Sequence, residues 1–242
     1  MITYLLLNGT LNFLKLCLIG QYVLLNSDVD GNNMNKSDAI DKENHIPGEP
    51  IFTGDIDIPG MTEENLRYHL KKLTDSGIIC RFEPGVYYFP KTDIFGERMS
   101  LSPDTVAVHK YILRRGKRVG YYSGYTLANR MGLSTQIPFT QEINSNFAPA
   151  LVRKTTIKNR QYIIRRPVVE ITEENAPVLQ FLDCLKDIEK CTEIEPEKCG
   201  KILTEYARKN GITKKKIDRY ITNYPLKIYK AIYETEVEYV SS

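Results

Sequence analysis

The sequence predicts an α+β protein, with an N-terminal winged helix-turn-helix followed by a mixed α/β domain that ends in helices. Three observations predict this fold. An amphipathic helical pattern leads directly into a tight hairpin within residues 62–90, short strand patterns separated by turns fill residues 117–166, and helical periodicity begins after Thr172. A chain of 242 residues suits two modest domains or one large one. We favour two domains, at residues 34–98 and 99–242.

The helix at the centre of the first domain is the most informative element. Thr62 is suited to cap its N-terminus, and the two glutamates that follow favour the positive end of the helix dipole. Gly77 lies where the helix should end, because glycine readily takes the left-handed conformation that closes a last turn. Leucines at helical spacing form one apolar stripe between these two residues: Leu66, Leu70 and Leu73.

A hairpin should follow this helix. Residues 78–82 and 86–89 have the composition of strands, and Pro84-Gly85 between them favours a tight turn. Helix, strand, turn and strand in this order form the second half of a winged helix-turn-helix. The elements expected ahead of the helix are a short helix at 35–45, a turn at 47–50, a strand at 51–52 and a helical turn at 53–57.

The helix face opposite the leucines offers groups that could bind DNA. A recognition helix places base-reading side chains near its N-terminal half and phosphate-neutralising side chains along its flanks. The expected base-reading residues are Asn65, Arg67 and Tyr68, and the expected phosphate contacts are Lys71, Lys72, Arg81 and Lys91. The alternative is that helix and hairpin form a generic packing unit whose lysines are solvated. We favour DNA binding because of this basic footprint.

Charge is distributed unevenly along the chain. Residues 110–166 carry twelve Lys/Arg against the single Glu142, a net charge of +11, whereas the whole chain carries +3. A polyanion or an acidic protein surface is the natural partner of such a segment. The residues that we expect to contact DNA or a toxin are Arg114, Arg115, Lys117, Arg118, Arg153, Lys154, Lys158, Arg160, Arg165 and Arg166. A solvated hairpin face is the alternative, and the lack of compensating acids favours binding.

Capping and turn residues divide the second domain. Ser102-Pro103 should begin a helix that ends at Gly116. The tetrad Thr-Glu-Glu-Asn occurs at 62–65 and again at 172–175, which predicts the same capping bond twice. The other expected elements are strands at 117–122, 139–146, 150–157 and 162–166, and helices at 124–131, 196–209, 214–222, 225–233 and over the apolar stripe 179–188.

Residues 1–33 are expected to lie outside the fold. The stretch Met1 to Leu25 is apolar, but Lys15 lies in its middle and no small-residue cleavage site follows, which argues against a signal peptide. Asn8, Asn12 and Gln21 weaken a transmembrane interpretation. We favour an apolar or disordered extension upstream of the domain, because the polar run that follows has the composition of a flexible joint.

Cysteine usage points to a reducing compartment. The chain holds five cysteines with no C-x-x-C spacing, so neither a disulfide framework nor a zinc site is expected, and the cytoplasm is the default location. We expect Cys184, Cys191 and Cys199 to pack inside helices, and we expect no metal, no cofactor and no membrane partner.

Together these stretches resemble the antitoxins of the AbiE type, the antitoxin half of type IV toxin–antitoxin and abortive-infection systems. The resemblance covers about residues 34–185. Residues 1–33 depart from it, and the last helices match it only loosely. The residues that carry it are Ile51-Phe52-Thr53, Leu66 to Leu73, Gly77-Ile78-Ile79, Gly85 to Lys91, Gly120 to Gly124, Asn129 and Gly132 to Pro138.

The resemblance implies a cytoplasmic protein of phage defence. Its N-terminal winged helix would bind double-stranded DNA of its own promoter and repress its own operon as a transcriptional regulator. Its C-terminal, antitoxin-like domain would counter a nucleotidyltransferase-like toxin without catalysis of its own.

Two other classes of function compete with this one. A protein-interaction module would use the basic middle segment to dock an acidic partner. A nucleic-acid-processing enzyme would need carboxylates that hold a metal and a lysine beside the attacked phosphate. Asp104 could begin such a signature, but no Glu-x-Lys or Asp-x-Lys follows it. The histidines His45, His69 and His109 lie in helical or loop context without a nucleophile elbow.

Overall fold

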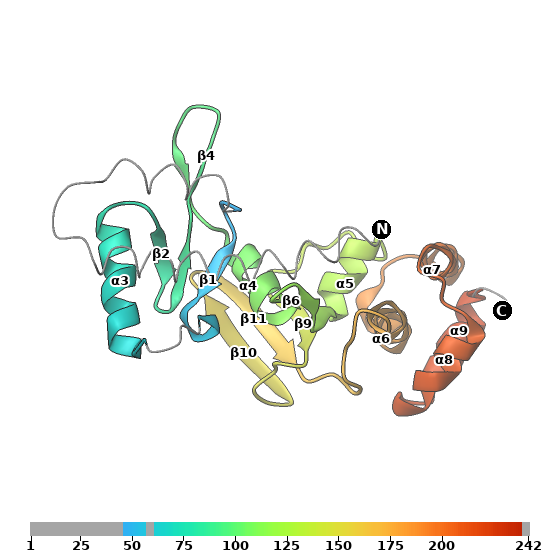
Figure 1. The fold of residues 1–242 in the computed structure, drawn as a ribbon. Helices are drawn as coiled ribbons and strands as arrows, with labels where there is room; N and C mark the ends of the chain where they lie inside the picture. The colour runs from blue at the N-terminus through green and yellow to red at the C-terminus, as the bar shows by residue number, and fades with distance from the viewer. Residues whose placement is uncertain (1–45, 57–60, 239–242) are drawn as a thin grey trace. The chain divides into compact units, whose positions relative to one another are not determined.

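The computed structural model describes residues 46–56 and 61–238. These residues fall into two compact units, divided between Val106 and Ala107, and each unit is described by itself. Helices and several small sheets occur in both, which confirms the α+β class (Figure 1). Within the described residues, no helix is both long enough and apolar enough to span a membrane. The expected helix at 35–45 and the extension at 1–33 lie outside the described residues.

The first unit is built on a three-stranded antiparallel sheet and one long helix. The strands β1 (Pro50–Phe52), β2 (Cys80–Glu83) and β3 (Val86–Tyr88) lie in the order β1-β3-β2. The helix α3 (Glu63–Asp75) lies beside this sheet (Figure 1). Its stripe of leucines is buried with Ile79 and Tyr87, which confirms the predicted inward face.

Both ends of α3 are closed as predicted. The Thr62 side chain accepts a hydrogen bond from the Asn65 backbone N–H at 3.3 Å, and so satisfies one of the free donors at the helix N-terminus. Gly77 has a φ of +73°, and the N–H of Ile78 donates to the Leu73 carbonyl at 3.0 Å. This arrangement is the one in which a left-handed glycine ends a helix and returns the chain. A short 3-10 turn at Thr53–Asp55 replaces the longer helical turn expected there.

A second hairpin of the first unit was not predicted. Strands β4 (Lys91–Thr92) and β5 (Arg98–Met99) pair antiparallel. The Asp93 side chain accepts hydrogen bonds from the N–H groups of Phe95 and Glu97, at 2.8 and 2.9 Å, and thereby fixes the turn. Ile94 and Phe95 at its tip are 92% and 82% exposed.

The helix that begins at Ser102 is shorter than predicted. The Ser102 hydroxyl accepts from the Thr105 N–H at 3.0 Å, but α4 (Pro103–Tyr111) ends well before Gly116. A small hairpin follows instead, made of β6 (Leu113–Arg114) and β7 (Lys117–Arg118). Arg115 and Gly116 both have positive φ, which suits a two-residue hairpin turn, so Gly116 serves a turn and does not end a helix.

The second unit contains a four-stranded mixed sheet. Its strands are β8 (Gly120–Tyr122), β9 (Gln141–Ser145), β10 (Val152–Ile157) and β11 (Arg160–Arg165), in the order β10-β11-β9-β8. β9 and β11 run parallel, and the other pairs are antiparallel. β10 is therefore an edge strand. The strands predicted at 139–146, 150–157 and 162–166 are confirmed, with bounds that shift by at most two residues. The single strand predicted at 117–122 is wrong, because these residues are divided between β7 of the small hairpin and β8 of this sheet.

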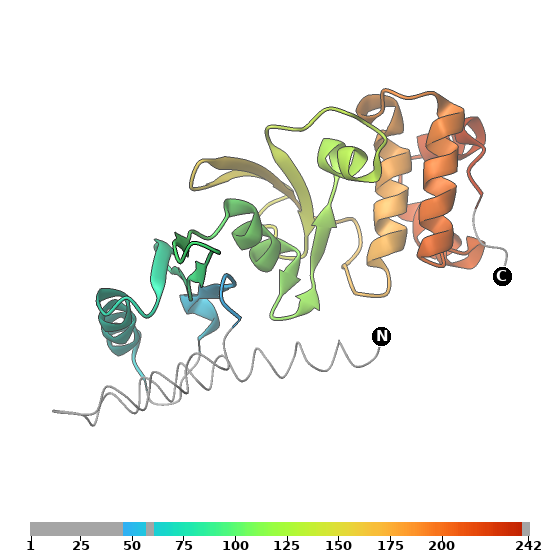
Figure 2. The ribbon, with the colours of Figure 1, turned by 90° about the horizontal axis from the view of Figure 1, so that it is seen from above.

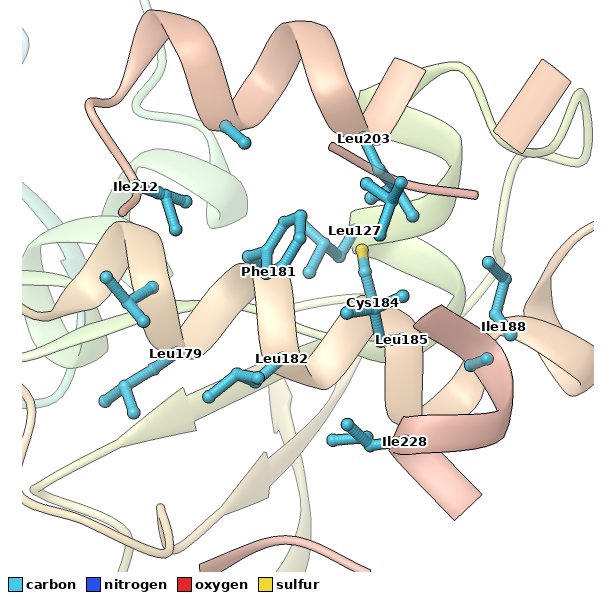
Figure 3. Packing of buried hydrophobic residues seen from close by; sticks show 14 of the residues in the cluster. Leu127, Leu179, Phe181, Leu182, Cys184, Leu185, Ile188, Leu203, Ile212 and Ile228 are labelled. Carbon is cyan, nitrogen blue, oxygen red and sulfur yellow. The ribbon is translucent and has the colours of Figure 1, made fainter. Parts of the chain in front are cut away.

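Helices make up the rest of this unit. They are α5 (Gly124–Met131), α6 (Ala176–Cys191), α7 (Pro196–Lys209), α8 (Lys214–Tyr220) and α9 (Lys227–Thr235), with a 3-10 turn at Ile221–Asn223. α6 and α7 lie side by side (Figure 2). Leu179, Phe181 and Leu203 are among the residues that form their shared core with α5 and α9 (Figure 3). Thr213 caps α8 through a bond from the Lys216 N–H at 3.3 Å, as predicted.

Candidate nucleic-acid interface and a buried polar cavity

The outer face of α3 presents the side chains predicted to read bases. Asn65, Arg67 and Tyr68 are all exposed. Tyr68 is 65% exposed although its ring is largely apolar, and it makes an edge contact with the His69 ring at 5.5 Å between centroids. Arg67 pairs with Glu63 one turn earlier, at 2.8 Å. Because both partners are highly exposed, this pair contributes little to stability and can exchange for another anion.

The predicted phosphate contacts are also at the surface. Lys71 and Lys72 extend from the same face of α3, Arg81 from β2, and Lys91 from β4, and all four side chains are exposed. None of them forms an ion pair with another residue in the described part of the chain. Three acidic residues on α3 balance its three cations, so the helix alone supplies no net positive charge.

Some of the basic residues predicted in the middle segment bind acids of their own unit. Arg165 donates to a carboxylate oxygen of Glu142 from two nitrogens, at 3.2 and 2.9 Å. Arg118 pairs with Glu173 at 3.3 Å. A third, Arg114, lies over the Phe147 ring with its guanidinium carbon 4.3 Å from the ring centroid. For Arg165 and Arg118, a structural role accounts for the position of the charge.

The basic residues of β10 are placed differently. Arg153 stands opposite Ile164 and Lys154 opposite Ile163, so the two cations project from opposite faces of the strand. Both are exposed, and neither pairs with an acid among the residues that the structure describes. Charged side chains on an edge strand also hinder pairing with another chain. Lys117 and Arg166 are also exposed. Lys158 has a φ of +53° and forms the turn that leads to Arg160.

The structure also shows a buried polar cluster that sequence reasoning missed. Asp183 of α6 is 3% exposed, and its Oδ2 accepts from the Tyr121 hydroxyl at 2.8 Å and from Asn144 Nδ2 at 2.6 Å. Its other oxygen, Oδ1, pairs with the Lys186 ammonium. Tyr121 and Asn144 stand opposite each other on β8 and β9, on the sheet face that meets α6. The signal in the sequence is one Asp inside the apolar run of α6.

Burial and charge act together in this cluster. Burial raises the pKa of Asp183, although the Lys186 ammonium opposes the shift. Burial would lower the pKa of Lys186, but the Asp183 carboxylate raises it above its usual value. Burial and the same carboxylate raise the pKa of the Tyr121 hydroxyl. Tyr121 is therefore held as a hydrogen-bond donor.

A polar cavity of about 210 Å³ adjoins this cluster. It lies between the sheet face that carries Glu142, Asn144 and Arg165 and the helices α5 and α6. Its lining consists of Ser123, Gly124, Glu142, Asn144, Arg165, Lys186, Asp187, Lys190 and Cys191. The Ser123 hydroxyl and Asn144 Oδ1 are buried, and neither has a hydrogen-bond partner among the described residues.

The cysteines in the described residues are free, and three of them are packed in helices as predicted. Cys184, Cys191 and Cys199 are buried, and Cys184 Sγ lies 3.2 Å from Met131 Sδ. Burial raises the pKa of the Cys191 thiol to about 11. In the part of the chain that the structure describes, no three His, Cys, Asp or Glu side chains gather as a set of metal ligands.

Comparison with protein families assigns the chain to one family. Residues 45–210 match the model of DUF6088, a family of unknown function. The chain belongs to this family. The match begins ahead of β1 and ends just after α7, so it includes α3 and its hairpin as well as the residues around the polar cavity. A search of curated proteins gave no match.

Proposed function

We propose that this DUF6088 protein is a DNA-binding transcriptional repressor that acts as the antitoxin of a type IV toxin–antitoxin system. In this proposal α3 and the hairpin β2–β3 are the recognition helix and wing of a winged helix-turn-helix. The protein autoregulates its operon, works in the cytoplasm and counters a nucleotidyltransferase-like toxin. It has no catalytic role.

The observation that carries the DNA-binding part is the exposed polar face of α3. Asn65, Arg67 and Tyr68 lie toward the N-terminal half of the helix, and Lys71 and Lys72 extend the same face by one turn. A helix that reads the major groove needs base-reading groups near its N-terminus and cations along its length. The turn Pro84-Gly85 follows directly after β2, in the position of a wing.

The charge balance of α3 suggests that cations of the second unit provide most of the phosphate contacts. Because the acids and cations of α3 balance, its own attraction to phosphate is weak. Residues 110–166 hold the excess of cations, and Arg153 and Lys154 are exposed without an acidic partner among the described residues. We therefore assign base readout to α3 and most of the phosphate contact to the second unit.

The test is binding of the purified chain to its own upstream DNA and to a scrambled duplex, over a series of salt concentrations. Changing Asn65, Arg67 and Tyr68 to Ala should remove the preference for the upstream DNA. The matched control changes Asn223, Arg219 and Tyr229 to Ala, which removes the same residue types from an exposed surface of the C-terminal helices. Equal affinity of the unchanged protein for both duplexes would contradict the repressor function.

A second candidate function is a protein-interaction module. The exposed cations of β10 favour it, because an acidic protein surface would bind Arg153 and Lys154 as well as phosphate does. Absence of any DNA binding, together with retained neutralisation of a toxin in cells, would support this candidate over the first.

A further inference from the structure

The cavity between α5, α6 and the mixed sheet has the features of a binding site for a small molecule. Its volume of about 210 Å³ exceeds that of a packing defect. Because an apolar cavity of about 150 Å³ can hold benzene, this one has room for a molecule of roughly eight or nine non-hydrogen atoms. The residues that line it are mostly charged or polar, so an apolar ligand is excluded.

Two of the lining side chains each bury one polar atom that has no hydrogen-bond partner among the described residues. Ser123 is 3% exposed and Asn144 is 6% exposed, and the Ser123 hydroxyl and Asn144 Oδ1 accept or donate no hydrogen bond among the described residues. The amide orientation of Asn144 is fixed, since its Nδ2 must face the Asp183 carboxylate. Its Oδ1 is therefore an acceptor that requires a donor. Burying a polar atom without a partner is unfavourable, so both atoms call for a partner that the described residues do not provide.

The charged side chains around the cavity indicate where an anionic group of a ligand would lie. Arg165 is neutralised by Glu142, and Lys186 by Asp183 and Asp187. Lys190 contacts the Tyr125 ring at 5.3 Å and forms no ion pair with any described residue. Ser123 and Gly124 place the N-terminus of α5 at the same cavity, where the Ser123 side chain does not cap it. The Glu142 carboxylate lies against Gly124, since a Cβ there would be 2.5 Å from Glu142 Oε1. Glu142 therefore already supplies an anion to this helix N-terminus. Lys190 is the cation that remains for an anionic group of a ligand.

We propose that this cavity binds a free α-amino acid with a small side chain. Its carboxylate would lie against Lys190 and the Ser123 hydroxyl. Its ammonium would donate to Asn144 Oδ1 near the carboxylates of Glu142 and Asp187. A simple anion would leave Asn144 Oδ1 without a donor, and a simple cation would meet the Lys190 ammonium. A zwitterion satisfies both ends, and the site does not depend on the proposed DNA binding.

The experiment is a thermal-unfolding screen of the full chain with each standard amino acid, followed by calorimetric titration of those that bind. At about a hundredfold excess over Kd, a ligand of the folded state should raise Tm by roughly 5–10 °C. Amino acids with small side chains should bind, whereas Phe, Tyr and Trp should not, because the cavity lacks the volume for their rings. Failure of every amino acid to raise Tm or release heat would overturn the proposal and indicate a water-filled cavity.

Two variants separate binding from folding. Lys190→Ala should weaken binding about tenfold or more, because it removes a charge-assisted contact. The control Lys215→Ala, at an exposed position of α8, should leave affinity unchanged. Ser123→Ala should weaken binding several-fold while the unliganded protein keeps or gains stability, since the lost hydroxyl has no partner. Unchanged affinity in Lys190→Ala and Ser123→Ala would show that any binding occurs elsewhere and would overturn the site.

Discussion

At the scale of single residues, the polar cluster around Asp183 shows how a hydrogen bond can decide stability. Changing Tyr121 to Phe removes the donor at 2.8 Å from Asp183 and leaves a buried carboxylate with one partner fewer. We expect this to lower the free energy of unfolding by about 1–2 kcal/mol. The measurement is urea unfolding, with Tyr233→Phe as the control, because Tyr233 is 84% exposed. Equal stability of the two variants would show that the Tyr121 hydroxyl contributes nothing net.

The buried thiol of Cys191 gives a second prediction at this scale. Its pKa of about 11 leaves about a hundredfold less thiolate at pH 8 than an ordinary cysteine has. Alkylation in the native protein should therefore modify Cys80, which is partly exposed, well before Cys191. Peptide mapping by mass spectrometry measures both rates. Between pH 7 and pH 9 the Cys191 rate should still be rising about tenfold per unit, and a plateau in that range would contradict the raised pKa.

At the scale of elements, a glycine permits the close packing of α7 against α9. A Cβ on Gly200 would lie 1.8 Å from the Thr235 carbonyl oxygen, so any larger residue must push the two helices apart. Gly200→Ala should lower the free energy of unfolding by at least about 2 kcal/mol, despite the higher helix propensity of alanine. Gly54→Ala makes the same chemical change where a Cβ meets open space, and it should be nearly neutral. Thermal unfolding compares the two variants, and a Gly200→Ala variant more stable than the unchanged protein would contradict this prediction.

The elements that sequence reasoning located are those fixed by local interactions. The tetrads at 62–65 and 172–175 form the same bond, from the Asn N–H to the Thr hydroxyl, at 3.3 and 3.2 Å. In the second tetrad residues 173–175 form a turn, and α6 begins only after them, at Ala176. The bounds of α7 were predicted exactly by Pro196 and by Asn210-Gly211 at its ends. Capping and turn chemistry depends on neighbours in the chain, so it can be read without the fold.

What could not be predicted depends on residues far apart in the sequence. Asp183 meets Tyr121 and Asn144 only because the sheet order brings β8 and β9 under α6. The same geometry turns Arg165 toward Glu142, although its position in a basic segment predicted an outward contact. The sequence alone offered one hint, since Glu142 is the only acid between residues 110 and 166. The polar cavity is therefore a property of the topology.

At the scale of the whole molecule, the excess of positive charge divides into a part that stabilises the fold and a part available for binding. Arg165→Ala would leave the carboxylate of Glu142 buried without its cation. Since the arginine side chain is itself partly exposed, we expect a loss of about 2 kcal/mol, at the low end for such pairs. Arg153 and Lys154 have no acidic partner among the described residues, so their loss should leave stability within about 0.5 kcal/mol.

The salt dependence of the proposed DNA binding tests whether Arg153 and Lys154 contact phosphate. If Arg153 and Lys154 each neutralise one phosphate, changing both to Ala should reduce the slope of log K against log salt by about 1.8, with the preference for the upstream DNA retained. Asn65→Ala should weaken the preference for the upstream DNA and leave the slope of log K against log salt nearly unchanged. The reason is that a base contact carries sequence preference and little salt dependence. Urea unfolding of each variant ensures that only folded protein is compared. An unchanged slope in the β10 variant would remove these residues from the DNA interface, and their charge would then be explained by protection of the edge strand.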